Sequence, residues 1–178
     1  MKKIIIFLLG ISSGAFSQNY YVCKAGQTSF FSETPMENIS ALDNKVAAVI
    51  DTDKNEIAVK ITMTDFKFKN HLMEEHFNEN YMESDKFPLG TFKGKIQETV
   101  DYSKNGSYDI TAVGSLNMHG VTKERTLKGK MEILNGQIKL NCDFEIPLKD
   151  HKIDIPTLVI AKIAESIAVK NTFVFTKK

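Results

Sequence analysis

The sequence predicts an all-β protein, an eight-stranded antiparallel up-and-down barrel with one short helix. Two observations lead to this fold. Apolar and polar residues alternate along several segments, which is the period of strands with one buried face. The segments are joined by short turns rich in Asn and Gly, and such turns connect antiparallel neighbours. About eight twisted strands with one apolar face are best completed by closing the sheet on itself, because closure leaves no exposed edge.

The strands are predicted in order along the chain. They lie near residues 20–32 and 38–50, and over 57–63, 92–97, 108–118, 127–133, 138–146 and 167–175. Tight turns are expected at residues 53–55, 105–106 and 135–136, where Asn and Gly tolerate a positive φ.

One segment, Asn70 to Glu83, has helical spacing of its apolar residues instead. Asn70 is suited to cap this helix, and the pair Phe87-Pro88 ends the segment. We expect the helix to pack over one end of the barrel, with a second helical turn at Leu158–Glu165.

The N-terminus has the pattern of a secretory signal peptide over residues 1–17. Lys2 and Lys3 precede an apolar run, and small residues lead to Ser17, after which cleavage is expected. The apolar run is too short to span a bilayer. We therefore expect a periplasmic or secreted protein with a single domain, residues 18–178.

The charge balance gives no reason to expect a nucleic acid partner. Without the two signal-peptide lysines the chain has 21 basic and 22 acidic residues, and these are spread along the sequence. Cys23 and Cys142 could form a disulfide in an oxidising compartment or be two small core residues, and the sequence leaves both alternatives open.

No catalytic motif is present, so we expect no enzymatic activity and assign no catalytic residue. His71, Glu75 and His76 suggest a metal site, but the inverted zincin motif needs one residue fewer between the histidines. The extra residue turns His71 away from His76 at helical pitch. We therefore predict no metal and no cofactor.

The inward positions of the predicted barrel combine small and long apolar residues, which would leave a cavity with apolar walls. The predicted cavity-lining residues are Phe92, Gly94, Ile96, Ile110, Gly114, Leu116, Met118, Gly129, Met131, Ile133 and Phe144. The same pattern would also fit a filled barrel in which glycines serve only curvature.

Two motifs resemble those of the YceI-like lipid/polyisoprenoid-binding family. Residues 71–96, HLMEEHFNENYMESDKFPLGTFKGKI, resemble its helix and the strand start that follows. Residues 114–123, GSLNMHGVTK, look like its G-x-L-x-x-H-G-V-T-K signature. The resemblance covers residues 56–178, and the N-terminal third lacks the usual family opening.

The resemblance implies a lipocalin-like barrel, export to the periplasm and an isoprenoid or similar lipid in the cavity. It gives a lining role to Phe92, Leu116 and Met118. Family members often pair as dimers, so a homodimer is compatible with it. His119, in a predicted turn, is a candidate for a polar contact at the barrel rim or for a bond to nearby backbone.

The sequence therefore favours a periplasmic binding or carrier protein for a long-chain isoprenoid or other apolar lipid. The alternative is a filled barrel that acts through its surface as a structural or partner-binding, stress-related module.

Overall fold

The computed structural model describes residues 19–155 and 163–178. The predicted signal peptide lies outside these residues, as does most of the second helical turn predicted at Leu158–Glu165.

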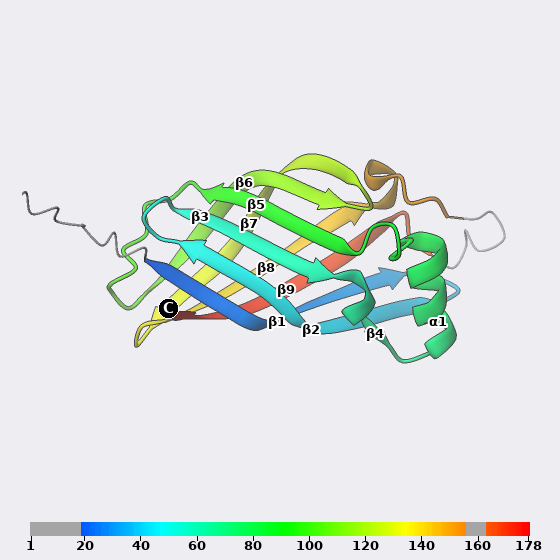
Figure 1. The fold of residues 1–178 in the computed structure, drawn as a ribbon, viewed down its shortest axis with the longest axis horizontal. Coiled ribbons are helices and arrows are strands. Elements are labelled where there is room, and N and C mark those ends of the chain that lie inside the picture. Colours follow the sequence, from blue (N-terminus) through cyan, green and yellow to red (C-terminus); the bar gives the residue numbers. More distant parts are fainter. Residues whose placement is uncertain (1–18, 156–162) are drawn as a thin grey trace, which may run out of the picture.

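Eight long strands close into an antiparallel barrel (Figure 1). Their order around the ring is β1-β9-β8-β7-β6-β5-β3-β2, and β1 pairs with β2 to close it. The strands are β1 (Tyr20–Glu33), β2 (Asn38–Asp51), β3 (Glu56–Thr62), β5 (Leu89–Ile96), β6 (Gly106–Met118), β7 (Val121–Leu134), β8 (Gln137–Pro147) and β9 (Ser166–Lys177). The predicted eight-stranded up-and-down barrel is confirmed. A further two-residue strand, β4 (Lys67–Phe68), pairs only with β2 and was not predicted.

The segment between β3 and β5 covers one end of the barrel, as Figure 1 shows for α1. It contains η1 (Met63–Asp65), β4, α1 (His71–His76) and the π-helical turn η2 (Phe77–Tyr81). The side chain of Asn70 caps α1 by accepting a hydrogen bond from the backbone N–H of Leu72 at 3.0 Å. We call residues 63–82 the end cap and this end of the barrel the capped end.

The opposite end, which we call the packed end, is filled by apolar side chains. Its largest fully buried side chains come from five different strands and include Ile50, Ile96, Met131, Ile138 and Phe175. At a rise of about 3.3 Å per residue, these strands are long enough for the barrel to have one half filled by side chains and another half that contains a cavity.

In two places, strands that are neighbours in the ring are not paired toward the capped end. β2 pairs with β3 only through Ala47–Asp51, and its first half pairs with β4 of the end cap instead. β7 pairs with β8 only through Lys130–Leu134. At these two places the hydrogen-bonded ladder of the barrel wall therefore stops before the capped end.

Candidate ligand-binding cavity

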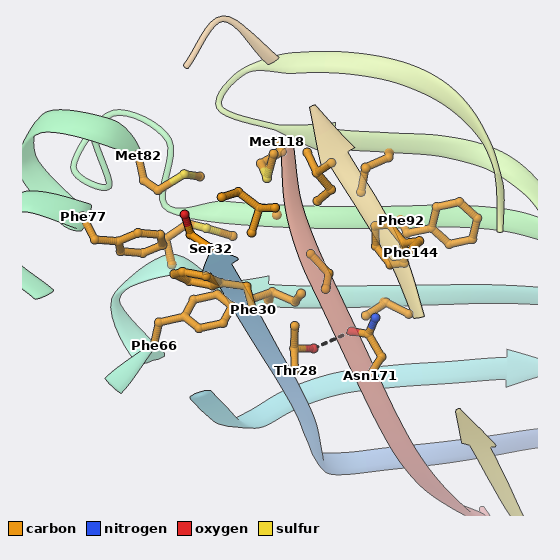
Figure 2. Close-up of a pocket in the computed structure, with 18 of the residues that line it drawn as sticks. Thr28, Phe30, Ser32, Phe66, Phe77, Met82, Phe92, Met118, Phe144 and Asn171 are labelled. Atoms are coloured by element: carbon orange, nitrogen blue, oxygen red, sulfur yellow. Dashed lines mark hydrogen bonds between the residues drawn. The ribbon is translucent and has the colours of Figure 1, made fainter. Parts of the chain in front are cut away.

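The capped half of the barrel contains a cavity of about 470 Å³. Its wall is made by inward-facing residues of the strands and by the end cap, as the close-up in Figure 2 shows. The apolar wall includes Val59, Ile61, Met63, Phe92, Ala112, Leu116, Leu127, Leu140, Phe144, Ile167 and Phe173. This volume lies within the usual range for small-molecule sites, and walls of this kind favour an apolar guest.

Six of the eleven predicted lining residues lie on this wall: Phe92, Ile110, Leu116, Met118, Gly129 and Phe144. Whether they contact a ligand stays a prediction.

The other five predicted lining residues do not lie on the wall. Ile96, Met131 and Ile133 point inward but belong to the packed end, where neighbouring side chains fill the barrel. Gly94 is covered, because a Cβ at this position would lie 2.7 Å from Cζ of Phe92. At Gly114 a Cβ would lie 2.1 Å from the carbonyl oxygen of Lys93 on the neighbouring strand. These two glycines therefore allow close packing and do not provide free volume.

Four phenylalanines close the cavity beneath the end cap. Phe30 from β1 packs against Phe66, Phe68 and Phe77, with ring centroids 5.3 to 5.6 Å apart. Phe77 in turn lies 5.7 Å from Phe66 and 5.1 Å from Phe68. This aromatic cluster joins β1, β4 and the helical turns of the end cap. Sequence reasoning missed it, although Phe66 and Phe68 stand close together just before the predicted helix.

A buried polar pair interrupts the apolar wall. The hydroxyl of Thr28 donates to Oδ1 of Asn171 at 2.7 Å (Figure 2). Nδ2 of Asn171 donates to the carbonyl oxygen of Cys142 at 3.0 Å. Thr28 and Asn171 both line the cavity. The signal for this pair was an Asn at an inward position of β9, between Val169 and Phe173.

Charge is nearly absent from the cavity. Of the described residues that line it, only Glu37 has a carboxylate, and none is Lys or Arg. Cys142 also lines the cavity, and burial, aided by the nearby negative charge of Asp143, raises the pKa of its thiol to about 11. Cys23 and Cys142 are both free thiols, so the disulfide alternative does not describe this structure.

His119 lies outside the cavity wall, in the turn between β6 and β7, with a φ of 51°. Its Nδ1 is 3.0 Å from the carbonyl oxygen of His151, and its Nε2 is 3.2 Å from Oε2 of Glu83. The pKa of Glu83 is lowered, first by Lys86 and then by His119. His119 thus connects the β6–β7 turn to two neighbouring segments at the capped end.

Among the described residues, no three His, Cys, Asp or Glu side chains come close enough together to share a metal ion. His71 forms an exposed pair with Glu75 at 3.8 Å. Within the part of the chain that the structure describes, no helix has the length and apolar character needed to cross a membrane.

Several solved structures have the same fold. One is a polyisoprenoid-binding domain from Saccharophagus degradans implicated in plant cell wall breakdown, with a TM-score of 0.77 and 14% identity over 90% of this chain and 99% of that chain. Another is BcnA from Burkholderia cenocepacia, with a TM-score of 0.70 and 14% identity over 84% of this chain and 95% of that chain. A YCEI protein from Campylobacter jejuni matches with a TM-score of 0.59 and 16% identity, over 99% of this chain and 91% of that chain.

A comparison with curated protein sequences finds no match. The family model of the YceI-like domain matches residues 21–175. The match begins well before residue 56, so it includes the N-terminal third that departs from the family motifs. With this fold and this coverage, the chain belongs to the YceI-like family.

Proposed function

We propose that this protein binds a long apolar molecule, an isoprenoid or another lipid chain, in the cavity at the capped end. The observation that carries the proposal is the cavity itself, which is lined mostly by apolar side chains and nearly free of charge. Burial of an apolar chain there gains about 25 cal/mol per Å² removed from water. The polyisoprenoid-binding domain from Saccharophagus degradans, which shares the fold, supports this ligand class.

The ligand head that fits this cavity is neutral. A phosphate or carboxylate would need a cationic partner or several donors when withdrawn from water. The described lining offers no Lys or Arg, and its buried polar side chains are neutral groups such as Thr28, Ser32 and Asn171. An alcohol, a ketone or a quinone oxygen can be satisfied by such groups.

Export is part of the proposal. It is supported by the charge and hydropathy pattern of residues 1–17. A carrier outside the cytoplasm would shield an apolar chain from water between membranes. The alternative of a completely filled barrel is not favoured, because only the packed end is filled.

Native mass spectrometry of the exported protein, followed by organic extraction, tests the proposal. We expect an additional mass in a one-to-one ratio that partitions into solvent and carries no phosphate. A protein that stays free of ligand after incubation with isoprenoid quinones and polyprenols would contradict it.

A further inference from the structure

The wall of the barrel has a seam between β7 and β8. Their ladder starts at the β7–β8 turn and ends at the pair Lys130 and Asn141, so residues 121–129 of β7 and 142–147 of β8 form no pairs with each other. Each strand is fully paired on its other side: β7 with β6 from Val121 onward, and β8 with β9 as far as Pro147. Figure 1 shows β7 arching away from β8 over this region. The seam thus lies between two strands that each stay paired with their other neighbour.

The cavity extends to both sides of the seam. Leu127 and Gly129 contribute to its wall from β7. Cys142, Phe144 and Ile146 contribute from β8. Only side chains therefore separate the apolar interior from the outside along this line.

Among the described residues, side-chain hydrogen bonds bridge the seam at Arg125 and, beyond its end, around His151, whose carbonyl oxygen also lies 3.0 Å from Nδ1 of His119. Arg125, the only arginine in the sequence, extends from β7 and donates through Nη2 to the backbone carbonyl oxygen of Glu145 on β8. Nearer the capped end, Nδ1 of His151 lies 3.2 Å from the carbonyl oxygen of Val121 and 3.3 Å from that of Met118. None of these contacts belongs to a strand ladder, so the seam can widen without unpairing any strand.

The end cap is the alternative route to the cavity, whose lining extends there to the exposed side chains of Leu72 and His76. A ligand passing beneath the cap must separate the cluster of four phenylalanines, which pack against one another. It must also displace Glu74, which accepts hydrogen bonds from Nζ of Lys67 at 2.5 Å and from the backbone N–H of Phe68 at 3.3 Å.

We propose that the apolar ligand enters and leaves the cavity sideways, through the seam between β7 and β8, and that Arg125 is the latch that holds the seam closed. This inference rests on the proposed function, because it assigns a route to the same cavity. A latch on the route changes the rates of binding and release together, whereas a residue of the binding wall changes the affinity.

Stopped-flow binding of the fluorescent apolar probe N-phenyl-1-naphthylamine tests the latch in Arg125→Ala. We expect both rate constants to rise by about three- to tenfold, the factor that one net hydrogen bond contributes, with the Kd nearly unchanged. Lys123→Ala is the matched control, since it removes one exposed positive charge from the same strand. Equal rates in the two variants would overturn the proposal, as would faster exchange in the end-cap variant Phe77→Ala alone.

A disulfide across the seam should slow ligand exchange, the opposite of the effect expected for Arg125→Ala. A Cβ built on Gly129 lies 3.4 Å from Cβ of Cys142, close to the separation found in disulfides. The same Cβ lies 2.7 Å from the carbonyl oxygen of Asn141, so the backbone must shift slightly. We expect oxidised Gly129→Cys to exchange the probe more slowly and to recover when reduced, while Gly129→Ser, with a similar steric change, does not respond to the reductant. Unchanged exchange in the oxidised form would overturn the proposal.

A measurement without ligand separates this inference from the proposed function. Cys142 stands on the cavity side of the seam, so its reaction with an apolar maleimide reports how often the seam opens. In a Cys23→Ala background, Arg125→Ala is expected to react faster than Lys123→Ala. Absence of probe binding at equilibrium would contradict the proposed function. Equal labelling rates in the two variants would overturn the seam as an opening, whether or not the probe binds.

Discussion

Thr28 and Asn171 form a hydrogen bond of 2.7 Å across β1 and β9, inside an otherwise apolar cavity. Asn171 uses its second polar atom to donate to the carbonyl oxygen of Cys142. The Thr28 oxygen can still accept a hydrogen bond, and Nδ2 of Asn171 has one more hydrogen to donate. The pair therefore gives the cavity one place where a neutral polar group of a ligand can be satisfied.

Thr28→Val removes this hydroxyl with little change in shape. We expect weaker binding of an isoprenoid alcohol, by about 1 kcal/mol, and no loss of affinity for the corresponding hydrocarbon. Calorimetric titration with the two ligands measures the difference. The control is Thr172→Val, at the residue that follows Asn171. The hydroxyl of Thr172 donates to Asn141 outside the cavity. Equal losses for alcohol and hydrocarbon would show that the pair does not select a polar group.

Asp43 is expected to lower stability at neutral pH. It is buried, Oδ1 accepts a hydrogen bond from the backbone N–H of Lys45 at 2.7 Å, and Oδ2 has no partner among the described residues. Burial raises the pKa of this carboxyl above the ordinary value of 3.8. The folded state therefore binds the proton more tightly than the unfolded state, and stability falls as the pH rises from below 3.8 through the raised pKa.

Asp43→Asn should remove this dependence. We expect a gain on the order of 1 kcal/mol in the free energy of unfolding at pH 7, shrinking toward zero below the ordinary pKa of Asp. Urea unfolding over a pH series measures it, with the exposed Asp85→Asn as control. A loss of stability at pH 7 would mean that the charge of Asp43 has a favourable partner in the folded protein.

Gly114 is expected to be required for the pairing of β5 with β6. A Cβ there would lie 2.1 Å from the carbonyl oxygen of Lys93 and 2.3 Å from Cα of Gly94, and backbone cannot easily move aside. Gly114→Ala should cost about 1 to 3 kcal/mol, the usual range for overpacking. Gly106→Ala, whose Cβ would meet only the Tyr108 side chain at 3.1 Å, should cost less. Thermal unfolding of both variants compares them, and equal midpoints would contradict the close strand contact.

The fold was predictable because alternation and turn residues are local signals. Each series of residues predicted to face inward, such as Ile138, Leu140 and Phe144, also faces inward in the structure. The capping of α1 by Asn70 was likewise predicted from the residue type and its position. Closure of the barrel then follows from the number of strands and the short turns between them.

The extent of the cavity was not predictable in the same way. Alternation says which residues face inward, but it does not say how far along the barrel axis side chains fill the interior. Met131 and Phe144 face inward alike, yet only Phe144 reaches the cavity. The rotamer of Phe92 decides that the space at Gly94 is filled. The seam was hidden for a related reason, because it depends on where two strands stop pairing.

Binding of N-phenyl-1-naphthylamine to Ala112→Phe and Val113→Phe tests the central claim most directly. Ala112 lies on the cavity wall, whereas its neighbour Val113 is exposed on the outer face of the same strand. We expect Ala112→Phe to fill the cavity and lower the affinity for the probe at least about tenfold, or 1.4 kcal/mol, while Val113→Phe binds like the unmodified protein. If both folded variants bind the probe equally well, the apolar ligand does not occupy this cavity.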